Sequence, residues 1–217
     1  MKILGVIPPR MESKRLPGKP LLDINGKSMI QRVYESSINC KNLDDLIIAT
    51  PNDEIVSHVK EFNGNVLKTT DKPINGTERV YEAVEKINKK YDFIINIQGD
   101  EPFIKTEQIN DLIKICVKPN EICTLIKNET YSKELTQDSV MKVVKNINNE
   151  ALYFSRSLIP SGNPDQYYRH ICIYAYTPKV LRKIVHLKPT PHEKSESLEQ
   201  LRWFCLLYTS DAADDLW

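Results

Sequence analysis

A short stretch near the N-terminus has the composition of a phosphate-binding loop. The segment IPPRMESKRLPGKPL, residues 7–21, carries four cations among ten consecutive residues, namely Arg10, Lys14, Arg15 and Lys19. Pro17 stiffens this segment, and Gly18 allows close approach of the backbone to a ligand. Guanidinium and ammonium groups on such a loop can hold triphosphate oxygens by charge-assisted hydrogen bonds. Residues 8–21 are called the basic loop below.

The spacing of the basic loop excludes two common nucleotide-binding motifs. The loop lacks both the Gly-x-x-x-x-Gly-Lys-Ser/Thr pattern of a P-loop and the Gly-x-Gly-x-x-Gly pattern of a dinucleotide-binding fold. Taken alone, its charge fits a solvated basic turn or a localisation patch equally well. A nucleic-acid-binding surface is less favoured, because no aromatic residue interleaves with the cations.

A second polar cluster follows the apolar run at residues 93–97. The sequence QGDEP places Gln98, Asp100 and Glu101 just beyond this run, which is typical of a buried strand. Ligands of open α/β sheets bind at the carboxyl ends of the strands, so these residues and the basic loop are expected on one rim. Mg²⁺ prefers carboxylates together with phosphate oxygens, and Asp100 suits that role. The alternative is a plain Asp-Glu turn that ends a strand.

Composition limits the classes of function that the protein can have. The formal net charge is +1, and no apolar run approaches the roughly 18 residues of a membrane span. The sequence therefore predicts a cytoplasmic protein with neither nucleic acid nor membrane among its partners. Five cysteines, an odd number, are widely spread and are expected to be free thiols.

Strand and helix patterns alternate in the first half of the chain. Strands are expected at residues 3–7, 46–49, 66–69 and 93–97, and helical patterns at 28–39, 53–62 and 80–87. Ser28 and Asn52 are expected to cap the first two helices. Such alternation predicts an α/β fold with a mostly parallel sheet covered on both faces.

The second half of the chain has a different pattern. Short apolar runs, ICTLI, VMKVVKNI, ALYFS and ICIYAY, are separated by polar loops and predict a mixed-sheet lobe. SESLEQLRWF predicts an amphipathic helix that ends at Phe204. Residues 205–217 abandon this pattern and are expected to be a non-native tail, so that the natural chain would continue differently.

Six motifs together resemble one enzyme family. IPPRMESKRLPGKPL, NGTER, INIQGDEP, ALYFSRSLIP, RHICIYAY and LEQLR occur in the order found in 3-deoxy-manno-octulosonate cytidylyltransferases, also called CMP-Kdo synthetases. The resemblance covers about residues 2–204. Pro9 stands where such enzymes usually carry Ala. A second metal-binding Asp in an Asp-Thr-Pro-Glu-like stretch, implied by the resemblance, has no counterpart, and Asp211, Asp214 and Asp215 in the tail are not taken as substitutes.

The resemblance implies a fold, a reaction and an assembly. It implies a Rossmann-like fold of the nucleotide-diphospho-sugar transferase type, as one domain over residues 1–204. Residues 1–120 would bind the nucleotide, and residues 121–204 would bind the sugar and form a homodimer. CMP would pass from CTP to 3-deoxy-manno-octulosonate (Kdo) with Mg²⁺ as cofactor and pyrophosphate as by-product, for lipopolysaccharide synthesis.

The resemblance also assigns roles to individual residues. The catalytic residues would be Arg10, Arg15, Lys19 and Asp100, with Asp100 also the metal ligand. The nucleotide would be bound by Arg10, Ser13, Arg15, Lys19, Gly76, Thr77, Arg79 and Gln98, with Glu78 nearby. The sugar would be bound by Arg79, Gln98, Arg156, His170, Tyr174, Glu199 and Gln200. Two alternatives remain: a cytidylyltransferase for another acidic sugar such as sialic acid, and a nucleotide-binding module inactivated by truncation.

Overall fold

The chain forms two compact units in the computed structural model, which describes residues 1–12, 16–117, 120–162 and 164–207. Unit 1 comprises Met1–Leu125 and Cys172–Val185. Unit 2 comprises Ile126–Ile171 and the chain from His186 onward. The expected division into halves at about residue 120 stays a prediction, and the structure adds that a later segment, residues 172–185, returns to unit 1.

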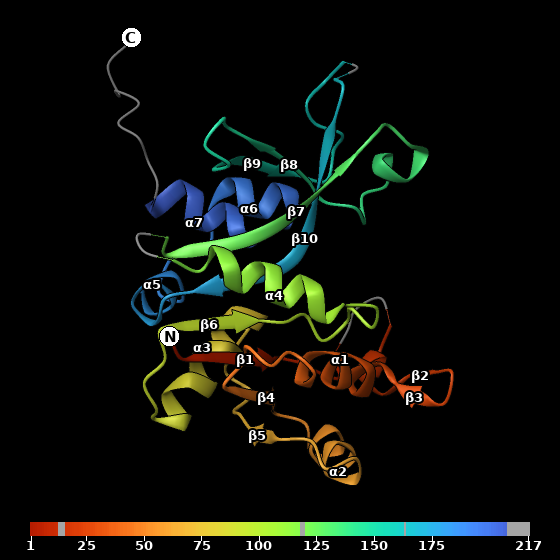
Figure 1. Ribbon diagram of the computed structural model, residues 1–217, viewed down its shortest axis with the longest axis vertical. Helices are drawn as coiled ribbons and strands as arrows, with labels where there is room; N and C mark the ends of the chain where they lie inside the picture. Colours follow the sequence, from red (N-terminus) through yellow and green to blue (C-terminus); the bar gives the residue numbers. More distant parts are fainter. Residues whose placement is uncertain (13–15, 118–119, 163, 208–217) are drawn as a thin grey trace. The chain divides into compact units, whose positions relative to one another are not determined.

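Unit 1 is built on four parallel strands and one antiparallel strand. The parallel strands lie in the order β5 (Val66–Lys68), β4 (Asp45–Thr50), β1 (Ile3–Ile7) and β6 (Phe93–Asn96) (Figure 1). The C-terminal part of β10 (Tyr167–Tyr176) pairs antiparallel with β6. All residues of β1 and β6 are buried, so both faces of the sheet are covered, because successive side chains of a strand point to opposite faces.

The helices of unit 1 follow the strands in alternation. They are α1 (Met29–Ile38), α2 (Asp53–Glu61), α3 (Gly76–Ile87), α4 (Thr106–Ile115) and α5 (Pro178–Ile184). A 3₁₀ turn, η1 (Lys19–Leu21), and the hairpin of β2 (Asp23–Ile24) and β3 (Lys27–Ser28) precede α1. The Ser28 hydroxyl accepts a hydrogen bond of 3.2 Å from the Gln31 amide, so the predicted cap of α1 is confirmed.

Unit 2 is a smaller sheet with helices. β8 (Lys142–Lys145) pairs antiparallel with β9 (Ala151–Ser155) and, at Arg169, with the N-terminal part of β10. β7 (Ile122–Glu129), which begins in unit 1, also pairs with β10. The remaining elements are η2 (Lys133–Thr136), α6 (Pro191–Glu196) and α7 (Gln200–Leu207). The apolar core of unit 2 contains Val143, Phe154, Leu198 and Leu201.

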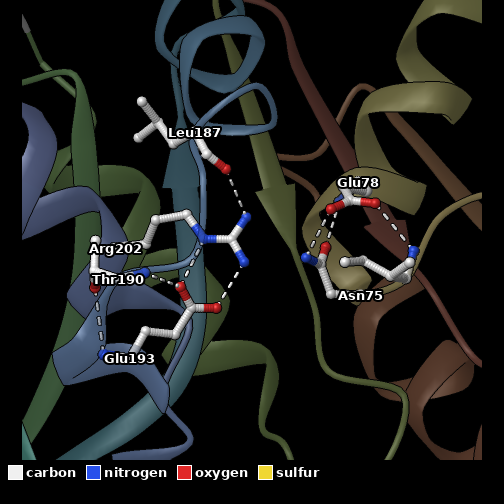
Figure 2. Close-up of polar contacts among 7 residues, drawn as sticks. Asn75, Glu78, Leu187, Thr190, Glu193 and Arg202 are labelled. Carbon is white, nitrogen blue, oxygen red and sulfur yellow. Dashed lines mark hydrogen bonds and ion pairs between the residues drawn. The ribbon is translucent and has the colours of Figure 1, made fainter. Parts of the chain in front are cut away.

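One carboxylate ties α6 to α7 inside unit 2 (Figure 2). Glu193 accepts two hydrogen bonds from the guanidinium of Arg202, at 2.6 and 2.8 Å, and Arg202 is only 4% exposed. The same glutamate completes a capping box with Thr190 at the start of α6. A third guanidinium nitrogen donates to the Leu187 carbonyl at 3.1 Å. Buried charge is therefore paired and hydrogen-bonded throughout this contact.

The predicted α/β fold with a mostly parallel sheet and a mixed lobe is confirmed, whereas the bounds of one expected helix are corrected and another helix is added. The helix expected over SESLEQLRWF is broken at Ser197, whose left-handed conformation (φ 52°) ends α6. α7 continues to Leu207, three residues past the expected end. α4 was not expected, although Ile109, Leu112 and Ile113 on its buried face have helical spacing. In the part of the chain that the structure describes, no helix could span a membrane.

His170 is a titratable group in the core of unit 2. Its ring packs edge-on against Phe154, with 4.9 Å between ring centroids, and its backbone amide donates to the Met141 carbonyl. The residue is 4% exposed, and burial lowers the pKa of its imidazole from 6.5 to about 3. His170 is therefore neutral in the folded protein at physiological pH.

Removing Arg202 should destabilise unit 2 strongly. Arg202→Met leaves the Glu193 carboxylate with no cationic partner, and we expect a loss of about 3–5 kcal/mol in the free energy of unfolding, measured by urea denaturation. Adding Glu193→Gln, which keeps the capping box, should restore part of the loss. Lys114→Met, at an exposed pair with Asp111, is the matched control and should cost less than about 1 kcal/mol. Equal losses from the two single variants would contradict the buried pairing.

The stability of the protein should fall at mildly acidic pH because of His170. The folded-state pKa lies below the unfolded one, so the unfolded chain binds one more proton between pH 6.5 and about 3. The contribution of neutral His170 is complete above pH 6.5 and is lost as the pH falls through this window, at up to about 1.4 kcal/mol per pH unit. Free energies of unfolding at several pH values should show a shallower slope for His170→Gln than for the wild type. Identical slopes would show that folding does not lower the pKa of His170.

Candidate functional site

The basic loop and the QGDEP turn pack against each other at one edge of unit 1. β1 and β6 are adjacent and parallel, so the segments that follow them emerge at the same edge. A Cβ atom added to Gly99 would lie 3.4 Å from Pro9 Cβ, and one added to Gly76 would lie 3.4 Å from Pro8 Cγ. The two prolines thus contact both the turn after β6 and the start of α3. Pro9, the departure from the family pattern, fills space against Gly99.

The base of the basic loop is held by backbone contacts and by Asn52. Gly18 has φ 71°, a conformation that favours glycine, and its amide donates to the Met11 carbonyl at 3.1 Å. Asn52 was expected to cap α2, but its side chain makes no such hydrogen bond. Its Oδ1 instead accepts from the Met11 amide at 3.1 Å, and its Nδ2 donates to Glu12. This second bond lowers the pKa of the Glu12 carboxyl.

An ion pair joins the basic loop to the QGDEP turn. Lys19 Nζ lies 2.8 Å from Asp100 Oδ2, although 81 residues separate them in the sequence. Their side chains are 30% and 54% exposed, respectively. An ion pair this exposed contributes about 0–1 kcal/mol at most, so ligands can displace it at small cost. Ser13 and Arg15, also assigned to the phosphates, lie outside the described residues.

Two predicted site arginines are engaged with the segment before α3. Arg79, only 3% exposed, donates to the Thr69 hydroxyl at 2.6 Å and to two backbone carbonyls of residues 70–73. Burial lowers the pKa of its guanidinium. Arg10 is exposed and donates to the Ile74 carbonyl at 3.1 Å. Arg79 therefore shapes the wall of the site, whereas Arg10 remains accessible to a ligand.

The remaining predicted residues of unit 1 surround this edge. Gly76 and Thr77 form the first turn of α3, which Asn75 caps by accepting from the Glu78 amide at 2.8 Å (Figure 2). The Glu78 carboxylate in turn accepts from the Ile74 amide. Gln98 follows β6 and is half-buried. Tyr174, on β10, is buried and lies directly opposite Asn96 of β6.

The donor set for a metal ion is small. Among the described residues, no group of three or more His, Cys, Asp or Glu side chains could hold a metal ion. Asp100 offers one exposed carboxylate. This set fits Mg²⁺, which commonly takes one or two protein carboxylates and completes its coordination with phosphate oxygens and water.

Unit 2 contains the other predicted sugar-binding residues. Arg156 donates from three guanidinium nitrogens to the backbone carbonyls of Asp138, Glu196 and Ser197. It thus bridges two loops, and within the described part of the chain these bonds use three of its five N–H groups. Glu199 and Gln200 lie at the start of α7, with Gln200 buried. His170 is buried and neutral, as described above.

Lys142 is a polar core residue that the sequence pattern did not reveal. It lies on β8, is fully buried, and donates to the carbonyls of Gln137, Val140 and Arg156. Burial lowers the pKa of its ammonium group. Because Lys142 holds the backbone of Arg156, it orients a predicted sugar-binding residue. Its position inside the apolar run VMKVV was the available signal.

Comparisons with known proteins agree on one family. The cytidylyltransferase family model matches residues 4–211. A 3-deoxy-manno-octulosonate cytidylyltransferase from Cytophaga hutchinsonii is 44% identical over 94% of this chain and 85% of its own length. One from Parabacteroides distasonis is 47% identical, covering 94% of this chain and 86% of that protein.

A solved structure shows the same fold. It is a CMP:2-keto-3-deoxy-manno-octonic acid synthetase complexed with CTP, with a TM-score of 0.87 and 38% sequence identity. The match covers 94% of this chain and 86% of the solved chain. The resemblance inferred from the six motifs is therefore confirmed by sequence and by structure, and the chain belongs to the 3-deoxy-manno-octulosonate cytidylyltransferase family.

Proposed function

We infer that the protein is a nucleotidyltransferase that transfers CMP from CTP to the anomeric 2-hydroxyl of Kdo and releases pyrophosphate. The observation that carries this inference is the match to named relatives over 94% of the chain. The likeness to a synthetase complexed with CTP adds structural support. We further propose that the enzyme acts in the cytoplasm as a homodimer, uses Mg²⁺, and supplies lipopolysaccharide synthesis.

In the proposed reaction, the 2-hydroxyl oxygen of the sugar attacks the α-phosphorus of CTP. A P–O bond forms to the sugar, the bond to the β-phosphate oxygen breaks, and the hydroxyl proton is released. No covalent enzyme intermediate is needed. Arg10 and Lys19 hold the phosphate oxygens and neutralise the charge that develops on the departing pyrophosphate. Their placement beside the carboxyl ends of β1 and β6 favours alignment of the reacting groups.

Asp100 is the proposed protein ligand for the metal. When bound, Mg²⁺ would polarise the phosphate oxygens and lower the pKa of the attacking hydroxyl. Asp100 must leave Lys19 to take this role, and Lys19 is then available to the phosphates. The low energy of their exposed ion pair makes this exchange feasible.

The sugar acid is proposed to be bound by side chains that match its polar groups. Kdo carries a carboxylate and several hydroxyls, which match guanidinium, amide, imidazole and phenol groups. Among the described residues, the bonds of Arg156 leave two of its N–H groups for the carboxylate. Neutral His170 can donate or accept one hydrogen bond but supplies no charge. Charge recognition in unit 2 therefore falls to Arg156 in this proposal.

The choice of sugar is tested by pyrophosphate release. With CTP and Mg²⁺, we expect release with Kdo and little with sialic acid or with no sugar. Mass spectrometry of the product should show CMP-Kdo. Release with sialic acid but not with Kdo would keep the reaction class and overturn the substrate. Binding of CTP with no release under any condition would make the chain a nucleotide-binding module.

Replacing Asp100 tests the metal site. Asp100→Asn keeps the size of the side chain but removes its charge, and we expect kcat to fall about 100-fold or more. The melting temperature should change little, because the lost ion pair is exposed. Asp111→Asn, which removes an exposed carboxylate paired with Lys114, is the matched control and should keep full activity. Near-normal turnover of Asp100→Asn would remove Asp100 from the metal site.

A further inference from the structure

Asn96 has a buried side-chain oxygen that nothing in the described chain satisfies. The residue ends β6 and is 2% exposed. Its Oδ1 has no hydrogen-bond partner among the residues that the structure describes. Buried polar atoms in native proteins are nearly always paired, because an unpaired acceptor loses its bonds to water without compensation. An unpaired buried acceptor of this kind is explained by a bound ligand, by a bound water or by a functional role.

The position of Asn96 connects this oxygen with the proposed reaction. Asn96 is the last residue of β6, two residues before Gln98 and four before Asp100. In the sheet it lies between Val6 of β1 and Tyr174 of β10. Residues directly opposite on paired antiparallel strands point to the same face, with Cβ atoms about 5 Å apart. The unpaired oxygen therefore lies beside the tyrosine that was assigned to the sugar.

The residues nearest to Asn96 in the sheet include apolar side chains, which cannot donate a hydrogen bond to its Oδ1. Val6, which pairs with Asn96 across the sheet, is apolar and fully buried, as is Ile94, which shares the face of Asn96 on β6. An apolar residue of similar size would suit these surroundings better than an amide. Keeping an amide there costs stability, and costs of this kind are concentrated at functional sites.

We infer that Asn96 is a further substrate-binding residue, whose Oδ1 accepts a hydrogen bond from a hydroxyl group of the acceptor sugar. This inference rests on the proposed function, because it needs a polyhydroxylated acceptor beside Tyr174. The sugar is favoured over CTP because Asn96 faces Tyr174, which is assigned to the sugar alone, whereas the residues assigned to the CTP phosphates belong to the basic loop. Asn96 would then recognise a hydroxyl group of the sugar and not its carboxylate.

The test is the kinetics and stability of Asn96→Leu in the full chain. We expect KM for Kdo to rise at least tenfold, KM for CTP to stay within twofold, and the melting temperature to equal or exceed that of the wild type. Asn96→Ser, which keeps a neutral side-chain oxygen that can accept a hydrogen bond, should retain more affinity for Kdo than Asn96→Leu and provides a second variant in case the leucine variant misfolds. Ile94→Leu, an apolar exchange on the same strand, is the matched control and should leave both KM values unchanged.

Each outcome separates this inference from the proposed function. If the wild type releases no pyrophosphate with Kdo, the proposed function fails before Asn96 is tested. If the wild type is active and Asn96→Leu has wild-type KM values, Asn96 does not bind the sugar. The inference is also overturned if KM for CTP rises as much as KM for Kdo, or if activity and melting temperature fall together in both Asn96 variants. In that last case the amide is structural.

Discussion

Parallel pairing of β1 with β6 brings a loop of cations and a turn of carboxylates to the same edge of a sheet. The two segments are about 80 residues apart in sequence, yet Lys19 and Asp100 form an ion pair of 2.8 Å. Pro8 and Pro9 pack close to Gly76 and Gly99, which lie at the start of α3 and in the turn after β6. Apolar packing of the two prolines therefore sets the shape of this edge, and the charged side chains add its electrostatic character. Its chemistry depends on the register of two adjacent strands.

Cations in this protein serve two different purposes. Arg79, Lys142 and Arg202 are buried, and their donors are directed to backbone carbonyls or to the Glu193 carboxylate. They fix loops that would otherwise expose unpaired carbonyls inside the protein. Arg10 and Lys19 are more exposed and make single, weak contacts. Only the second kind can exchange partners during a reaction without unfolding part of the chain.

The sequence allowed the sheet to be predicted better than the contacts at its edge. Strand and helix periodicity indicates which faces are buried, and this was enough to place the basic loop beside Asp100. The periodicity does not indicate with which hydrogen-bond acceptors a long side chain will pair. Asn52 has the sequence of a helix cap but tethers the basic loop, and Arg79 looks like a ligand-binding residue but holds residues 69–73. These contacts depend on tertiary neighbours, as does the break at Ser197.

The ion pair at the sheet edge also has a consequence for the way in which a polyphosphate would bind in the proposed reaction. Lys19 and Asp100 neutralise each other, so the long-range attraction of this edge for a polyphosphate comes from other cations of the basic loop, such as the exposed Arg10. A free polyphosphate would take Lys19 and leave Asp100 facing like charge. In the proposed reaction, a polyphosphate that arrives with a divalent cation would offer an opposite charge to both side chains at once. If the proposed roles of Lys19 and Asp100 hold, their pairing would favour the metal-complexed nucleotide over the bare anion.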